Sequence, residues 1–128
     1  MGGVRRVVPA AFSSPTLPVW RDHTVPLPGF CLGDGQPLTD ATVRLRRFGP
    51  DGAPVVVVLG GISSDRRVAD VGDGRVAWWP RIVRHGGPVD LDRYQVLGLD
   101  LLPGPGETAV RTLTPADQAR VLAAALDH

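Results

Sequence analysis

The chain contains 128 residues, of which 43% are hydrophobic and 21% charged, and its formal net charge at pH 7 is +1. This length predicts one domain, and the hydrophobic share is sufficient for a packed core. The near-zero charge gives no electrostatic basis for binding nucleic acid or an anionic membrane, so we expect neither partner. All 14 basic residues are arginines, but they are scattered among acids, which does not indicate phosphate recognition. No apolar run approaches the ~20 residues of a membrane-spanning helix, and we expect a cytoplasmic protein.

The distribution of proline divides the chain into two parts. Residues 1–28 carry five prolines and little hydrophobic periodicity, which indicates an extended Pro-rich amino-terminal arm with Trp20 as an anchor. Residues 29–128 are expected to form the folded domain. The single cysteine, Cys31, cannot form an internal disulfide, and its apolar neighbours predict a buried, unreactive thiol.

Three strands are predicted in the first half of this domain. A short apolar stretch at 30–32 precedes a turn-forming Gly-Asp-Gly, and residues 41–48 alternate polar and apolar side chains, as a strand with one wet face does. Residues 55–59 read Val-Val-Val-Val-Leu without polar alternation. Such a run is typical of a parallel strand buried on both faces, and Gly60 and Gly61 allow a tight exit from it.

The second half of the domain predicts two helices and one more buried strand. Apolar side chains at helical spacing predict a short helix that begins near Trp79 and ends at the Gly-Gly-Pro of 86–88. Residues 95–102 predict the buried strand. Thr114 and Pro115 then start a helix as its N-cap and first helical residue. Strands that alternate with helices indicate the α/β class, with a mixed, mostly parallel sheet flanked by helices.

The exit of the valine strand is the strongest candidate for chemistry. Backbone N–H groups around Gly60 and Gly61 could contribute to an oxyanion hole, which stabilises the negative oxygen formed during acyl transfer; a plain structural turn is the alternative. Ser63 and Ser64 lack the flanking glycines of the G-x-S-x-G elbow, so we expect neither to be a nucleophile. Asp100, at the end of the second buried strand, is either a functional carboxylate or, as we favour, an acceptor for local backbone N–H groups.

The remaining histidines and tryptophans predict structure rather than catalysis. His23, His85 and His128 lack the spacing of metal ligands, so no metal site is expected. His85 stands beside two glycines and is expected at a helix end. Trp78 and Trp79 are expected to pack in the core rather than to hold a ligand. We therefore expect no catalytic side chain within this sequence.

Several of these segments together resemble one enzyme family. They are VVVVLGGIS at 55–63, WW at 78–79, GGPVDLDRY at 86–94, VLGLD at 96–100 and TPADQA at 114–119. In this order and spacing they resemble the homoserine O-acyltransferases of the α/β-hydrolase superfamily, over about residues 27–128. The chain departs from the family pattern at Ala77, where a glycine is usual, and at Gly60 and Ile62 in the loop after the valine strand.

The resemblance implies the amino-terminal part of an α/β-hydrolase fold, with residues 29–128 forming half of the domain. Such enzymes transfer an acetyl or succinyl group from acyl-CoA to the homoserine hydroxyl, in methionine biosynthesis, through an acyl-serine intermediate. Acyl-CoA is a co-substrate, and no cofactor is expected. Of the family's functional groups, only the oxyanion loop can be placed here, at Leu59, Gly60 and Gly61. The Ser-His-Asp triad is expected beyond His128.

The resemblance also implies how the chain would act. The strands of this fold lie in the order 1-2-4-3-5-6-7-8, so without the fifth strand the valine strand is an open edge. We therefore expect the chain alone to be inactive and to need a complementary carboxyl-terminal polypeptide or the remainder of the enzyme. The complete enzyme would take small-molecule substrates and could form a homodimer. An esterase or another acyltransferase of the same fold, and a non-catalytic fragment that serves in binding or assembly, are the alternatives.

Overall fold

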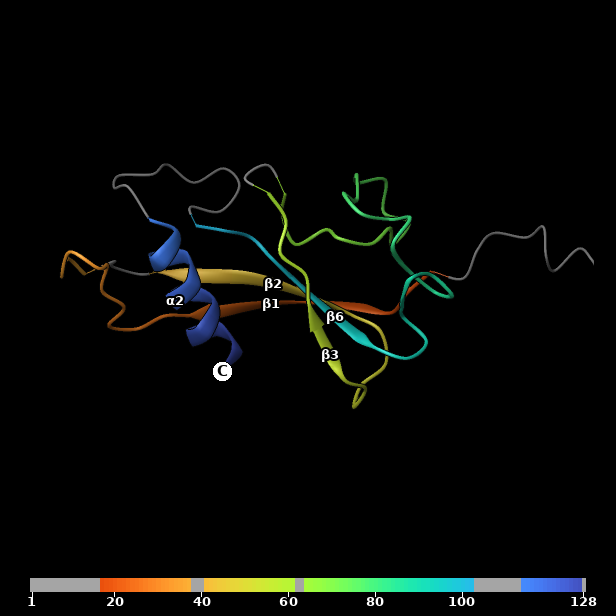
Figure 1. Ribbon diagram of the computed structural model, residues 1–128, viewed down its shortest axis with the longest axis horizontal. Coiled ribbons are helices and arrows are strands. Elements are labelled where there is room, and N and C mark those ends of the chain that lie inside the picture. The colour runs from red at the N-terminus through yellow and green to blue at the C-terminus, as the bar shows by residue number, and fades with distance from the viewer. Residues whose placement is uncertain (1–16, 38–40, 62–63, 103–113, 128) are drawn as a thin grey trace, which may run out of the picture.

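The computed structural model describes residues 17–37, 41–61, 64–102 and 114–127 (Figure 1). Within these residues four strands form the main sheet, and one helix follows them. Their bounds are β1 Trp20–Pro26, β2 Thr42–Phe48, β3 Val55–Val57, β6 Gln95–Leu99 and α2 Pro115–Leu126. The two-residue strands β4 Val83–Arg84 and β5 Val89–Asp90 pair separately. No described helix has the length and apolar character needed to span a membrane.

The main sheet is mixed, and its spatial order is β1-β2-β6-β3. β1 and β2 are antiparallel, as are β2 and β6, whereas β6 and β3 run parallel. Counted along the chain, these strands lie in the order 1-2-4-3, as the family resemblance predicted. The parallel pair brings the carboxyl ends of β3 and β6 together at one end of the sheet, where α/β folds bind their ligands.

Hydrophobic side chains cover both faces of the sheet. On one face α2 contributes Val121 and Ala125 to a first cluster with Val25, Leu27, Val43, Leu45, Leu97 and Leu99. On the other face the residues between β3 and β6 contribute to a second cluster of Phe48, Val58, Val68, Ala69, Val83, Leu91 and Val96. All five residues of β6 are buried, because this strand lies between the two clusters. Its neighbours Val96 and Leu97 face opposite clusters, as the alternation of a strand requires.

The elements with the clearest local signals form where the sequence predicted them. β2 falls within 41–48, β6 begins at Gln95, and α2 begins directly after its N-cap, Thr114. The Thr114 hydroxyl accepts a hydrogen bond from the Asp117 N–H at 3.1 Å, and the Asp117 carboxylate accepts one from the Thr114 N–H at 3.0 Å. This reciprocal capping satisfies amide donors that the start of a helix otherwise leaves open.

The strand predicted at 30–32 is wrong. β1 lies instead at Trp20–Pro26, inside the segment 1–28 that was predicted as an arm, and Cys31 forms only an isolated bridge to Pro37. Among the described strands β1 lies at an edge of the sheet, and it is exposed along most of its length. It therefore lacks the hydrophobic alternation by which a half-buried strand is recognised. Residues 1–16 of the predicted arm lie outside the described residues.

The short helix predicted near Trp79 is also wrong. A single turn forms there, in which the Trp79 carbonyl accepts hydrogen bonds from the N–H groups of Ile82 and Val83 at 3.2 and 3.1 Å. The chain then enters β4, and a turn through Gly86, with φ of 71°, leads into β5. The apolar side chains at helical spacing pack this turn and β4 against the second cluster instead.

β3 is an edge strand in the described part of the chain (Figure 1). It pairs with β6 on one side, and no described segment pairs with its other side. Val55 is 55% exposed, whereas Val58, just beyond the strand, is buried. The prediction that residues 55–59 are buried on both faces therefore holds only for Val58. The position of β3 matches the open edge that the resemblance implied.

Candidate active site

A cavity of about 440 Å³ opens at the carboxyl ends of the two parallel strands. Its walls come from the exit of β3, the end of β6 and the first turns of α2. The lining residues are Val58, Leu59, Gly60, Gly61, Ser64, Leu99, Leu101, Pro115, Gln118, Ala119 and Leu122. Most of these side chains are apolar, so the cavity favours an apolar ligand group with a few polar contacts at its edge.

The three residues predicted to form the oxyanion loop line this cavity together. Leu59, Gly60 and Gly61 are all exposed. Within the described residues, none of their backbone N–H groups donates a hydrogen bond. N–H groups without an acceptor among the described residues are available to donate to a developing oxyanion in an adjacent cavity. The geometry allows the predicted role, which stays a prediction.

Ser64 packs against Gly60 and is hydrogen-bonded to Gly61. A Cβ at Gly60 would overlap the Ser64 side chain and lie 2.9 Å from the Trp78 ring, so this position requires glycine. The Gly61 carbonyl accepts hydrogen bonds from the Ser64 N–H at 3.0 Å and from the Ser64 Oγ at 2.6 Å. The Ser64 hydroxyl is thus committed to a carbonyl oxygen rather than to a base. Ser63 lies outside the described residues.

Trp78 connects residues 59–61, the predicted oxyanion loop, to the segment that follows them. Its Nε1 donates to the Asp65 carbonyl at 2.7 Å, and its backbone N–H donates to the Arg67 carbonyl at 3.0 Å. Its ring stacks on that of Trp79 with centroids 5.7 Å apart. Trp78 packs against the second hydrophobic cluster, as predicted. The same prediction is wrong for Trp79, which is exposed.

Four charged side chains, from β1, β2, the segment after β3 and the residue after β6, are paired with one another. Asp100, which directly follows β6 and is 2% exposed, accepts hydrogen bonds from the backbone N–H and the Nη1 of Arg66, both at 2.8 Å. Arg66 Nε also donates to Asp22 of β1 at 3.3 Å. Arg46 of β2 holds the same carboxylate through Nε at 2.7 Å and Nη2 at 3.0 Å. We call Asp22, Arg46, Arg66 and Asp100 the charge cluster; its members compensate one another's loss of water.

The hydrogen bond from Arg46 holds the pKa of Asp22 below its ordinary value of 3.8, against the opposing effect of burial and with further help from Arg66. Asp100 is an acceptor of a backbone N–H, as favoured from the sequence, but its partner Arg66 lies 34 residues earlier rather than in the next loop. The two arginines were missed. Their shared partner, Asp22, lies 24 and 44 residues away, so no local spacing marks them.

The α2 side of the cavity is fixed by polar contacts of its first turn. Gln118 accepts a hydrogen bond from the Leu102 N–H at 3.1 Å and donates one to the Leu102 carbonyl, which ties the exit of β6 to the helix. The Asp117 carboxylate also accepts from the Gly33 N–H at 2.9 Å. The N–H of Thr114, followed by that of Gly33, keeps the pKa of Asp117 below its usual range. These contacts give the cavity a fixed wall.

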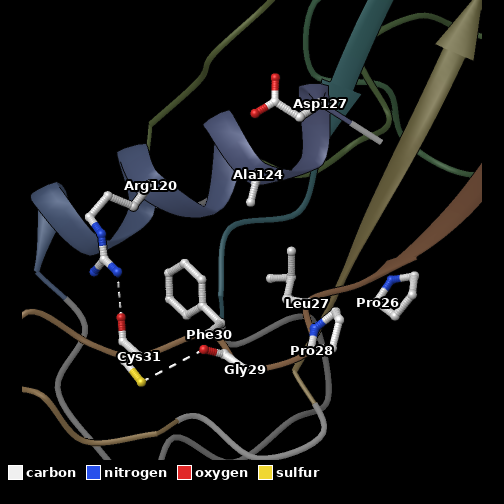
Figure 2. Close-up of a pocket in the computed structure, with 9 residues that line it drawn as sticks. All are labelled: Pro26, Leu27, Pro28, Gly29, Phe30, Cys31, Arg120, Ala124 and Asp127. Atoms are coloured by element: carbon white, nitrogen blue, oxygen red, sulfur yellow. Dashed lines mark hydrogen bonds between the residues drawn. The ribbon is translucent and has the colours of Figure 1, made fainter.

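A second cavity, of about 520 Å³, lies between α2 and the loop after β1 (Figure 2). Arg120 of α2 lies over the Phe30 ring, 4.8 Å from its centroid, and its Nη2 donates to the Cys31 carbonyl at 2.6 Å. Phe30 packs against the first hydrophobic cluster, whereas the Cys31 side chain is exposed. The prediction of a buried Cys31 is therefore wrong, because neighbouring side chains of this extended loop face opposite ways.

The described histidines lie outside both cavities. His85 Nδ1 is 2.7 Å from Asp92 Oδ1. It follows β4 rather than a helix, so the helix-end prediction is wrong. His23 lies in β1 opposite Leu45, and His128 is outside the described residues. Among the side chains that the structure describes, no group of three His, Cys, Asp or Glu could hold a metal ion.

Comparison with known proteins identifies relatives of the chain. It is 32% identical over 110 residues to the homoserine O-acetyltransferase of Mycolicibacterium smegmatis and 34% identical over 92 residues to that of Symbiobacterium thermophilum. The resemblance to the homoserine O-acyltransferase family is confirmed. These matches cover 72% and 66% of this chain but only 29% and 24% of the two homoserine O-acetyltransferases, so the chain spans about a quarter of their length. No family model matches the chain.

Solved structures show the same fold. The homoserine O-acetyltransferase of Staphylococcus aureus matches with a TM-score of 0.73 at 22% identity, over 85% of this chain and 35% of that one. Esterase E22 matches with a TM-score of 0.69 at 20% identity, over 85% of this chain and 37% of that one. The chain therefore has the architecture of the amino-terminal part of an α/β-hydrolase domain. The part that each solved structure shares with this chain is little more than a third of that structure.

Proposed function

We propose that this chain forms the oxyanion-loop side of a homoserine O-acyltransferase site. In the assembled enzyme a serine hydroxyl from another segment attacks the thioester of acyl-CoA, its proton passes to the histidine, and CoA leaves as the thiol. The homoserine hydroxyl then attacks the acyl-serine, takes the acyl group and releases the serine hydroxyl. The N–H groups of Leu59, Gly60 and Gly61 bind the negative oxygen of each tetrahedral intermediate. One such donor lowers the barrier by about 3 kcal/mol. Acyl-CoA enters as a co-substrate, and the proposal requires no cofactor.

One observation carries this proposal. The backbone N–H groups of three residues, which donate to no described residue, stand beside an apolar cavity at the carboxyl end of β3, in a chain related to homoserine O-acetyltransferases. The methyl of an acetyl group and the methylenes of a succinyl group are apolar, and the carbonyl of either group becomes negative during transfer. A wall of apolar side chains with N–H donors at one edge suits both properties.

We also propose that a further polypeptide segment, in a separate chain or in the remainder of the enzyme, pairs along the outer edge of β3. The Pro54 carbonyl and the Val58 N–H bond to β6, and Val56 lies opposite Val96. In a parallel pair the alternate residues, here Val55 and Val57, direct their backbone groups away from that partner. An uncharged valine edge left open is a template for aggregation, so its coverage also keeps the protein in solution.

The test is an acyl-transfer assay on the assembled enzyme, meaning this chain together with the polypeptide that supplies a G-x-S-x-G serine, an acid and a histidine. Acetyl-CoA and succinyl-CoA are offered separately with homoserine, and the homoserine ester is measured by mass spectrometry. We expect ester with one of the donors, and none from the chain alone. A stable assembly without transfer or ester hydrolysis would overturn the proposal and favour a binding module.

An esterase is the second candidate, favoured by the structural match to esterase E22. The same oxyanion loop serves ester hydrolysis, because both reactions pass through a tetrahedral oxyanion. The assay separates the two functions directly. Hydrolysis of simple esters that exceeds homoserine acylation in the assembled enzyme assigns the chain to an esterase.

A further inference from the structure

We propose that Arg66 and Asp100 form a positioning pair that holds the oxyanion loop, residues 59–61, in its working geometry. The inference rests on the function proposed above. Neither residue lines the cavity, so neither is assigned a contact with substrate. Their role is to fix the backbone from which Ser64 and Trp78 support the loop.

The pair clamps the backbone of residue 66 onto the sheet. Asp100 is itself anchored, because its N–H donates to the Arg44 carbonyl of β2 at 3.0 Å. Its carboxylate then holds both the backbone N–H and the guanidinium of Arg66, each at 2.8 Å. Arg66 reaches Asp22 of β1 as well. The Arg66 side chain thus connects β1 and the residue after β6 to a segment that forms neither helix nor strand.

Two short paths lead from this clamp to the loop. Ser64, two residues before Arg66, donates both its N–H and its Oγ to the Gly61 carbonyl. The carbonyl of Asp65 accepts from Trp78 Nε1, and the Trp78 ring lies against Gly60. One support of the loop is therefore Ser64 itself, and the other, Trp78, is bonded to Asp65. A shift of residue 66 would move both supports at once.

Arg46 provides a control that distinguishes a positioning role from a purely stabilising one. It is as buried as Arg66 and binds the same Asp22 carboxylate. Among the described residues its side chain also contacts the Trp20 ring at 4.0 Å and Asp73 at 3.9 Å, and it makes no hydrogen bond or ion pair with residues 64–66. Removing Arg66 leaves the buried Asp100 carboxylate without its partner, and removing Arg46 takes two hydrogen bonds from Asp22, whose side chain is 40% exposed. Both substitutions lower stability. Only the loss of Arg66 should also release the loop.

The experiment compares Arg66→Gln and Asp100→Asn with the matched control Arg46→Gln in the assembled enzyme. Asp100→Asn keeps the shape and the acceptor oxygen of Asp100, and Arg66→Lys keeps the charge, so that one pair variant folds even if Arg66→Gln does not. The first readout is amide hydrogen exchange at Ser64, whose N–H bonds the Gly61 carbonyl. The second is the separate measurement of kcat and of KM for homoserine.

We expect Ser64 exchange about 10-fold faster in the pair variants through local opening, and unchanged in Arg46→Gln once global stability is accounted for. We expect kcat to fall about 10- to 100-fold in the pair variants, as displaced catalytic groups cause, with KM for homoserine within about twofold. Arg66→Lys should recover part of kcat. Arg46→Gln should change neither parameter.

Two results would overturn the inference. One is equal Ser64 exchange in the pair variants and Arg46→Gln, which would make the pair merely stabilising. The other is faster exchange with kcat intact, which would show that the loop geometry is not set by this clamp. If the unaltered assembly transfers no acyl group, the proposed function fails, and the exchange data alone still decide whether Arg66 and Asp100 position the loop.

Discussion

The carbonyl oxygen of Arg66 lies 2.6 Å from the point that a Cβ at Gly98 would occupy. The Val68 Cγ2 atom is equally close to that point. Residues 66–68 can therefore pack directly against the backbone of β6 only because position 98 has no side chain. Asp100 follows Gly98 by two residues, so this contact places Arg66 beside Asp100. The charge cluster forms there.

Gly98→Ala should destabilise the protein by about 1–3 kcal/mol, the usual cost of forcing extra atoms into a packed interior. Urea unfolding of the assembled protein measures this change. Gly61→Ala is the matched control for stability, because a Cβ at Gly61 meets no atom within 4 Å. Equal stability of the two variants would contradict the close contact at Gly98.

The cap of α2 predicts a second stability difference. Thr114→Ala removes the hydroxyl that accepts the Asp117 N–H, and should cost about 1 kcal/mol. Thr114→Ser keeps the acceptor and should unfold at nearly the urea concentration of the unaltered protein. Urea unfolding followed by helical circular dichroism checks both. A Thr114→Ser variant as unstable as Thr114→Ala would show that the methyl group, not the cap, matters.

Acid should destabilise the fold. The pKa of Asp22 is lowered chiefly by its hydrogen bond from Arg46, and those of Asp90 and Asp117 by backbone N–H groups. Each folded pKa lies below the ordinary 3.8, so the unfolded chain binds protons first as pH falls. The stability these carboxylates contribute is present above about pH 4 and is lost as pH falls through their folded values.

Urea unfolding between pH 7 and pH 3 measures this dependence. Asp22→Asn should unfold more easily at pH 7 and lose less further stability on acidification, because one of the three titrating groups is gone. A variant with the same acid dependence as the unaltered protein would assign the effect to other groups.

Gly60→Ala should abolish most acyl transfer in the assembled enzyme. The new Cβ would overlap Ser64 and press on Trp78, so the loop must move away from its supports. A donor displaced by about 1 Å can cost 100-fold in rate, and kcat/KM measures the loss. Gly33→Ala, at a glycine outside the cavity lining where the nearest atom would be 3.4 Å away, should retain activity. Full activity of Gly60→Ala would remove the loop from the mechanism.

Local patterns explain which parts of the fold were predictable. Neighbouring residues alone determine the cap at Thr114, the apolar run of β6 and the alternation of β2. Each of these elements forms where predicted. β1 was missed because an exposed edge strand needs no apolar alternation. The helix near Trp79 was wrong because helical spacing of apolar residues also suits a turn followed by β4, once both pack on the same cluster.

The candidate site likewise has one part that local sequence patterns predict and one part that they do not. The exit loop after the valine strand was visible because glycines after a buried strand are a local signal, and the three predicted residues do line one cavity. The charge cluster was not visible, because Asp22, Arg66 and Asp100 come from separate parts of the sequence and meet only in the folded sheet. Cys31 was misassigned because burial depends on which neighbour faces the helix.

Amide hydrogen exchange at Val57 tests most directly whether the valine strand is completed from outside the described residues. Its N–H points away from β6, so it should exchange quickly in the chain alone and become strongly protected once the polypeptide that supplies the serine, acid and histidine is added. Strong protection of Val57 in a monomeric chain that melts sharply by itself would contradict the account.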